Sequence, residues 1–216
     1  MENPLIVFRH DHLVKADFLV SRYPVSRREY AAVSGTAGAD PAGDGYIKKA
    51  TWGEALAYCN RLSISLGLPP AYNLEYGLMI DEAGEELVEP HRARGFRLPT
   101  WFEWQQAALG ANNGERYGRG DHREILNKNY YKAAWEKAPG GCEELAKLEI
   151  NTAGLAGLLR PDREWVSDNR EWPKSRKHQS CGWEESVGRD DQFYLEVQVS
   201  NVPPETLLPF RVVRTA

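Results

Sequence analysis

Long apolar segments and paired cysteines are both missing from this sequence of 216 residues. No segment approaches the length that a transmembrane helix needs. The first residues, MENPLIVFRHDHLV, hold only one short apolar run between charges, so no signal peptide is predicted. The three cysteines, Cys59, Cys142 and Cys181, match no CxxC or other metal-binding spacing. Such a sparse, odd set is typical of a reducing compartment, and we expect a cytoplasmic protein that does not enter a membrane.

Positive charge is not in excess either. The chain has 27 Lys and Arg against 31 Asp and Glu, which gives a net charge of −4. Two basic runs, 91–97 and 173–178, are short or interrupted, as on a solvated surface. Neither nucleic acid nor an anionic membrane is therefore expected as a partner. The sequence also lacks a Gly-rich phosphate loop, a Gly-x-Ser-x-Gly elbow and a zinc signature.

Aromatic and turn-forming residues are abundant. Seven Trp and ten Tyr accompany 19 Gly and 13 Pro, a composition typical of a compact, loop-rich fold whose loops are held by large rings. No linker or repeat divides the chain, and its length favours one core. We predict a single α+β domain over 1–216, with two principal helices and long ordered loops.

Capping boxes predict where the helices begin. In such a box a Ser or Thr and a Glu three residues later satisfy each other's free backbone N–H groups. The three boxes lie at 26–29, 51–54 and 100–103. The helix after Thr51 has apolar residues at helical spacing until Gly67 and is the most clearly predicted helix of the sequence. The helix after Ser26 is predicted to be short and to end near Gly35.

The stretch RLPTWFEWQQAALG (97–110) contains the most aromatic of these helices. Trp101, Trp104 and Ala108 fall on one helical face. Two interpretations remain open, a core anchor and a platform on which a ligand stacks, and the frequent burial of such residues favours the anchor. We therefore expect Trp104 to be buried.

Strand patterns occur near both ends of the chain. The predicted strands are 5–8, 17–23, 192–199 and 210–214. A hairpin is predicted between Pro70 and Pro99, turning near 81–84. Residues 111–190 show little periodicity, so few regular elements are predicted there.

The order of these motifs resembles that of the formylglycine-generating enzymes, also called the sulfatase-modifying factor family. Five collinear segments carry the resemblance, from residue 17 to residue 214: DFLVSRYPVSRREY, KKATWGEALAYCNRLS, RLPTWFEWQQAALG, INTAGLAGLLRPDREWVSD and PFRVVR. The resemblance implies a fold related to C-type lectins, in which the tryptophan-rich helix is scaffold beneath the loops.

The resemblance also implies an activity and its cofactors. Active members oxidise a cysteine of a client sulfatase to formylglycine, using copper held by two cysteine thiolates. The corresponding region here, 180–211, contains only Cys181, so the copper pair is absent and no cofactor is expected. Calcium is disfavoured, because Pro161 replaces an asparagine ligand between Arg160 and Arg163. Asn129 is the one match to the family's other calcium site, and Glu164 is interpreted as a structural hydrogen-bond acceptor.

Two further groups of residues have competing interpretations. His10 and His12 would lie on one face of a strand and begin a metal site, but no third ligand is evident from spacing. Asp162, Glu164 and Asp168 suit either acid/base chemistry in a cleft or an arginine-neutralised surface loop, and we favour the loop. No catalytic residue and no metal ligand is assigned.

Two functional hypotheses follow. The first is a non-catalytic binding module that holds a protein partner or another ligand on its loop surface. Its candidate binding residues are Trp165, Trp172, Trp183, Asp190 and Asp191. Aromatic anchors among charges are typical of binding hot spots, although these tryptophans would equally serve to pin loops to the core. The alternative is a family enzyme with altered, copper-independent oxidative chemistry, which would need a convergent redox or acid/base group near 181–209.

Overall fold

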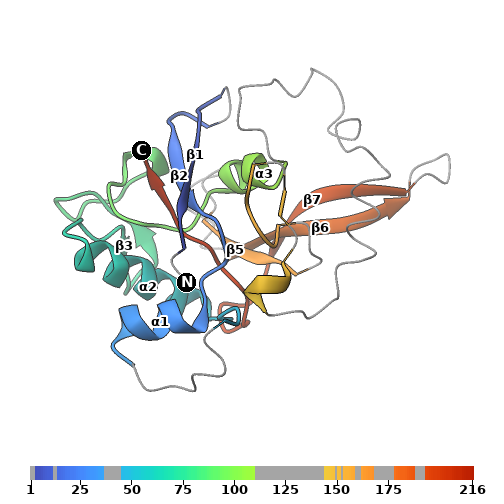
Figure 1. The fold of residues 1–216 in the computed structure, drawn as a ribbon. Helices are drawn as coiled ribbons and strands as arrows, with labels where there is room; N and C mark the ends of the chain where they lie inside the picture. Colours follow the sequence, from blue (N-terminus) through green and yellow to red (C-terminus); the bar gives the residue numbers. More distant parts are fainter. Residues whose placement is uncertain are drawn as a thin grey trace.

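The chain combines short strands with three α-helices in the described ranges, as an α+β fold (Figure 1). The computed structural model describes residues 3–11, 14–36, 45–109, 144–148, 150–151, 153–158, 162–167, 178–187 and 193–216. Within these ranges, no helix has both the length and the hydropathy needed to cross a bilayer.

The first sheet joins the two ends of the sequence. It has the antiparallel order β1 (Leu5–Phe8), β2 (Phe18–Ser21) and β8 (Val213–Thr215), with β2 in the centre. The prediction for 5–8 is confirmed, while the strands predicted at 17–23 and 210–214 are shorter or shifted. β8 begins after the predicted position because the chain before it bonds to a segment outside this sheet. There the Phe210 carbonyl accepts a hydrogen bond from the Val25 N–H at 2.9 Å.

The three helices begin where the capping boxes predict. They are α1 (Arg27–Ser34), α2 (Trp52–Ser65) and α3 (Trp101–Leu109). Reciprocal side-chain and backbone bonds cap α1 and α2, and the same pair of bonds joins Thr100 to Glu103 at α3. Gly35 ends α1 in the left-handed conformation, with φ of 71°.

The segment between α2 and α3 contains two successive turns. β3 (Tyr72–Asn73) and β4 (Leu78–Met79) pair across a tight turn that the sequence analysis missed. The predicted turn near 81–84 follows and is confirmed by a bridge between Ile80 and Glu86. The 3-10 turn η2 (Pro90–Arg92) then leads to α3.

A second three-stranded sheet has the order β5 (Glu164–Val166), β6 (Gln179–Val187) and β7 (Phe193–Asn201). β7 confirms the strand predicted at 192–199. The other two fall in the region where the sequence predicted few elements. β5 is buried on both faces, so its sequence shows no alternation of apolar and polar residues. In the sequence of β6, Gly182 and charged residues interrupt that alternation.

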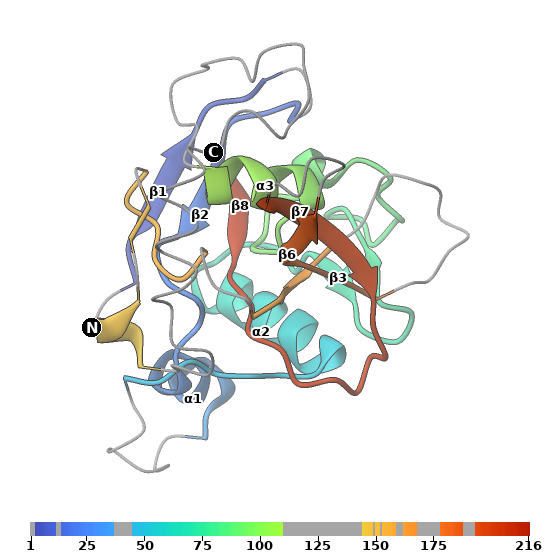
Figure 2. The same ribbon diagram turned by 90° about the vertical axis from the view of Figure 1, so that its right-hand side faces the viewer.

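The core has two main clusters that share strands. One lies against α3 and includes Trp104, which is 1% exposed, so its predicted role as an anchor is confirmed. The other surrounds the buried face of α2. Val213 belongs to the α3 cluster and its neighbour Val212 to the α2 cluster, and Figure 2 shows β8 running between the two helices. The shared strands make one domain.

Candidate functional site

The β6–β7 hairpin extends away from the rest of the described chain (Figure 1) and points toward the viewer in Figure 2. The first three residues of β6, 179–181, pair with β5. All nine residues of β6 pair with β7, so within the described ranges the backbone of 182–187 is paired on one side only. This hairpin and its base occupy most of the described part of 165–194, where the sequence analysis placed the binding residues.

Trp165 is a core residue, which corrects its selection as a surface contact. It is fully buried, its Nε1 donates to the Ala50 carbonyl at 2.8 Å, and its ring packs edge-on against Trp52 with centroids 5.3 Å apart. The sequence could not show this, because Trp165 lies on a three-residue strand without alternation. Its role is to hold β5 against the start of α2.

The other selected residues are only partly covered. Trp183 lies on β6 with its backbone opposite Val197, two residues beyond Cys181. Trp172, Asp190 and Asp191 lie outside the described residues. Their assignment as binding residues stays a prediction.

Cys181 lies in the interior. It is fully buried in the α3 cluster with Trp104 and Leu155, at a register position between Glu164 of β5 and Val199 of β7. Cys59 is equally buried but belongs to the α2 cluster, where desolvation raises the pKa of its thiol well above the usual range. Within the described ranges neither thiol forms a disulfide, as is expected of the small core residue predicted at Cys59. Cys142 lies outside the described residues.

Glu164 on β5 forms hydrogen bonds with α3 and with the segment before β8. Its carboxylate accepts from Arg211 Nε and Nη2, both at 2.7 Å, and from Trp104 Nε1 at 2.9 Å. Glu164 and Arg211 are both buried. The prediction of a structural acceptor is confirmed, whereas the interpretation of Glu164 as part of a surface loop is wrong. Asp168, the proposed neighbour in acid/base chemistry, lies outside the described residues.

A second buried ion pair stabilises the start of α3. Arg97 donates twice to Glu103, with both distances 2.7 Å, and Glu103 also accepts from the Thr100 N–H. Burial by itself raises the pKa of Glu103, but the Arg97 charge and these hydrogen bonds outweigh it, so the net pKa is lowered. The carboxyl group of Glu103 is therefore ionised, and its place is structural.

The residues that the sequence analysis considered as metal ligands are not brought together in the described part of the chain. His10 bonds to Asp17 at 2.6 Å, while His12, Asn129, Arg160 and Pro161 lie outside the described residues. Within the described ranges, no three His, Cys, Asp or Glu side chains are grouped as ligands of one ion would be. Arg163 is described, and its side-chain stem packs against Gly182 of β6.

At the base of the hairpin, two aromatic side chains from distant parts of the sequence pack against each other. His178 packs edge-on against Trp52 with centroids 5.3 Å apart, and partial burial lowers the pKa of its imidazole although Glu205 opposes this effect. Within the described ranges, the buried Ser180 Oγ has no hydrogen-bond partner. The sequence analysis missed this cluster, because Trp52 and His178 are brought together only by the fold.

Comparison with known proteins agrees with these motifs. The protein-family model for the sulfatase-modifying factor enzyme 1-like domain matches residues 7–214 of this sequence. The chain belongs to the sulfatase-modifying factor family. A curated relative, the chaperone protein LppX of Paenibacillus barcinonensis, is 23% identical over 209 residues, which cover 83% of this chain and 74% of LppX. No solved structure matches the chain.

The segments that carry the family resemblance are joined to one another inside the protein. Arg97 and Glu103 both come from RLPTWFEW, while Glu164 of the Glu-Trp pair bonds to Arg211 of the closing Phe-Arg strand. Trp104, also from RLPTWFEW, donates a hydrogen bond to the Glu164 carboxylate and so joins the Glu164–Arg211 pair. In this member of the sulfatase-modifying factor family, the most recognisable residues therefore build the scaffold.

Proposed function

We propose that this chain is a non-catalytic member of the sulfatase-modifying factor family that binds a protein partner. The observation that carries the proposal is the burial of Cys181. It is the single cysteine of 180–211, and its side chain packs in the α3 cluster. A copper–thiolate centre needs two converging thiolates that a client can reach, and a fully buried thiol with no neighbouring cysteine in that segment supports neither requirement.

The β6–β7 hairpin is the proposed contact surface. Its projection from the body and the one-sided backbone pairing of 182–187 suit addition of a strand from a partner, in which main-chain hydrogen bonds supply affinity. Trp183 lies within this segment, and Asp190 and Asp191 follow it in the sequence. With Trp165 assigned to the core, Trp183 becomes the principal aromatic candidate.

Two further observations support a binding role. LppX, a relative that covers most of this chain, is named a chaperone, and a chaperone acts on another protein. Cys59 and Cys181 form no disulfide within the described ranges, which suits the reducing cytoplasm that we propose as the location of this protein.

The test begins with capture of partners from the native host on the immobilised protein and their identification by mass spectrometry. Hydrogen exchange of the complex is then compared with that of the free protein. We expect protection within 165–194, and protection confined to other residues contradicts the proposed surface. Trp183→Ala should weaken binding of the captured partner at least tenfold. The exposed Tyr76, on the β3–β4 turn, provides the matched variant Tyr76→Ala, which should bind as the parent does.

A separate titration addresses the oxidase. Anaerobic addition of Cu(I), followed by native mass spectrometry, should yield no stoichiometric complex that depends on Cys181. A 1:1 complex that Cys181→Ser abolishes would overturn the non-catalytic assignment.

A further inference from the structure

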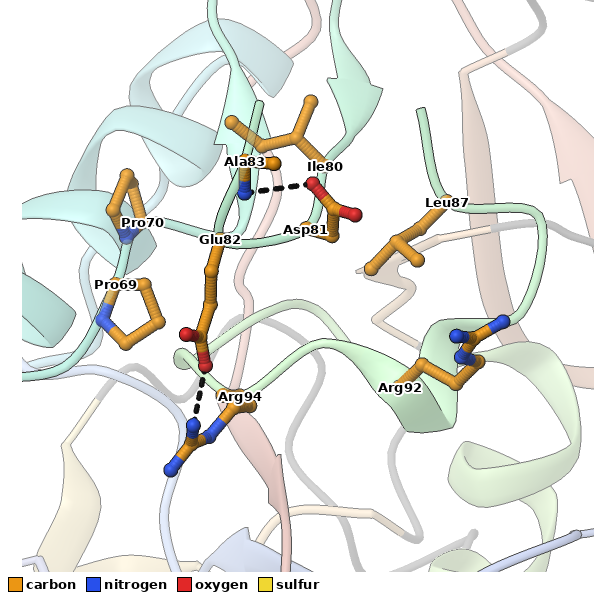
Figure 3. Close-up of a pocket in the computed structure, with 9 residues that line it drawn as sticks. All are labelled: Pro69, Pro70, Ile80, Asp81, Glu82, Ala83, Leu87, Arg92 and Arg94. Carbon is orange, nitrogen blue, oxygen red and sulfur yellow. Dashed lines mark hydrogen bonds and ion pairs between the residues drawn. The ribbon is translucent and has the colours of Figure 1, made fainter. Parts of the chain in front are cut away.

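A pocket of about 300 Å³ lies between the end of α2, the turn after β4 and η2. Figure 3 shows its lining residues surrounding the space, with Pro69 and Pro70 on one side and Leu87 on the opposite side. Ile80 and Ala83 border it from the turn. None of the residues proposed above for partner binding lines this pocket, so it is a separate feature of the molecule.

The interior of the pocket suits a small apolar group. Two prolines, an isoleucine and a leucine contribute hydrocarbon surface, and the volume is at the low end for small-molecule sites. That space accommodates one or two amino-acid side chains.

The charged groups of the pocket differ in how they are engaged. Glu82 and Arg94 form an ion pair that borders one side, as the dashed line in Figure 3 marks. Asp81 accepts from the backbone N–H groups of Ala83 and Glu85, both at 2.9 Å, so its carboxylate is used by the turn. The guanidinium of Arg92, by contrast, makes no hydrogen bond or ion pair within the described part of the chain.

The walls of the pocket are held by α2. The side-chain amide of Asn60 is buried and bonds to the backbone after α2. Its oxygen accepts hydrogen bonds from the Ala71 and Tyr72 N–H groups, and its nitrogen donates to the Tyr72 carbonyl at 2.7 Å. One turn later, Ser63 Oγ accepts from the Phe96 N–H at 2.7 Å. The wall with the prolines and the wall with Arg94 are thus fixed to one helix, so the pocket exists before any ligand arrives.

We propose that this pocket binds the free carboxyl terminus of a protein or peptide whose last residue is apolar. The terminal side chain fills the space between the prolines and Leu87, and the terminal carboxylate pairs with Arg92, whose planar guanidinium suits bidentate bonding to a carboxylate. An end is favoured over a through-running segment, because lining residues border the space on opposite sides and the Glu82–Arg94 pair borders it on a third.

The direct test is fluorescence anisotropy with a labelled peptide of sequence GSGSLL, compared with the same peptide amidated at its carboxyl end. We expect saturable binding of the free acid and at least tenfold weaker binding of the amide. Equal affinity of the two peptides, or no binding of the free acid at millimolar protein, overturns the proposal. An amidated peptide that carries an internal glutamate, GSGELL-NH2, distinguishes a terminal from a side-chain carboxylate, and equal binding of that peptide also overturns it.

Variants place the peptide in the pocket. Arg92→Gln should weaken free-acid binding at least fivefold and leave the weak amide binding unchanged. Ala83→Phe, at an exposed position of the turn, should fill the space and weaken both peptides. The matched variant is Arg28→Gln, which removes an exposed arginine on α1 and should bind as the parent does. If Arg28→Gln loses as much affinity as Arg92→Gln, the effect is general electrostatics and the proposed site is wrong.

Discussion

At the scale of single residues, the interior is unusual in holding two arginines and two glutamates away from water. Arg97 and Arg211 are fully buried, and each meets a carboxylate through two hydrogen bonds. Removing an ion from water costs several kcal/mol, so such a pair stabilises the fold only when its geometry is good and its remaining donors are used. Arg211 meets this condition, since it also donates to the Ser21 and Ala156 carbonyls.

Arg211→Met should lower the free energy of unfolding by about 3–5 kcal/mol, because it leaves the Glu164 carboxylate buried without its cation. Adding Glu164→Gln should recover part of that loss, since a neutral amide still accepts from Trp104 Nε1 and carries no unpaired charge. Urea unfolding of both variants measures this. A double variant less stable than Arg211→Met would contradict the account of a paired buried charge.

The lowered pKa of Glu103 predicts a pH dependence of stability. A carboxyl group whose pKa is lower in the folded than in the unfolded state stabilises the fold above its unfolded pKa, here near its ordinary 4.5. The contribution disappears as pH falls through the folded pKa. The stability difference between the parent and Glu103→Gln should therefore be constant from pH 6 to 8 and shrink below about pH 4.5. Urea unfolding across that range measures it, and a difference that grows on acidification would refute the assignment.

The buried thiols should be unreactive in the folded protein. In a Cys142→Ser background, Cys59 and Cys181 are the remaining thiols, and both are fully buried. Thiolate is the reactive form, and the raised pKa of Cys59 further suppresses it. Titration with a chromogenic disulfide at pH 8 should detect no rapid thiol before denaturation and two afterwards. Rapid reaction of either thiol in the native state would show that the core opens there.

At the scale of elements, α2 acts as the frame for the segment between it and α3. Its buried Asn60 and Ser63 hold two distant stretches of backbone, and Gly95 lets the second stretch approach closely. A Cβ at Gly95 would overlap the Pro69 carbonyl oxygen and lie 2.8 Å from Ser63 Oγ. By contrast, a Cβ added at Gly53, in the first turn of α2, would have open space around it.

Two glycine substitutions should therefore change stability in opposite directions. Gly95→Ala should destabilise the protein by about 1–3 kcal/mol, since backbone must shift to admit the methyl group. Gly53→Ala should stabilise it by up to about 1 kcal/mol, because alanine is the better helix former. Thermal and urea unfolding of both proteins compare them. If the two changes have the same sign, the close approach at Gly95 does not limit packing.

At the scale of the whole molecule, the two core clusters are not independent. Neighbouring residues alternate between them at two places: Trp165 and Val166 on β5, and Val212 and Val213 at the start of β8. Either cluster loses part of its wall if the other opens. Tryptophan fluorescence and far-ultraviolet circular dichroism should therefore report one coincident urea transition. Two separated transitions would show that the clusters unfold independently.

The sequence predicted best what depends on neighbouring residues. Capping boxes located the starts of α1, α2 and α3, because both partners of each box lie within four residues. What depends on distant partners was not predictable in the same way. The place of Trp165 is decided by Ala50 and Trp52, and that of Glu164 by Arg211, all far away in the sequence. The pocket likewise forms only when the chain after α2 and the chain after β4 are brought together.

The central position of β2 in the first sheet affects how the chain is made. Its partners β1 and β8 come from opposite ends of the sequence, and Phe210, Arg211 and Val213 complete the interior. During synthesis the chain up to β7 leaves the ribosome before these residues do. The nascent protein must then wait with an open core, exposing apolar surface. Folding of this core is therefore completed only after residues 210–213 have emerged, and a product truncated shortly before residue 210 would be treated by chaperones and proteases as unfolded.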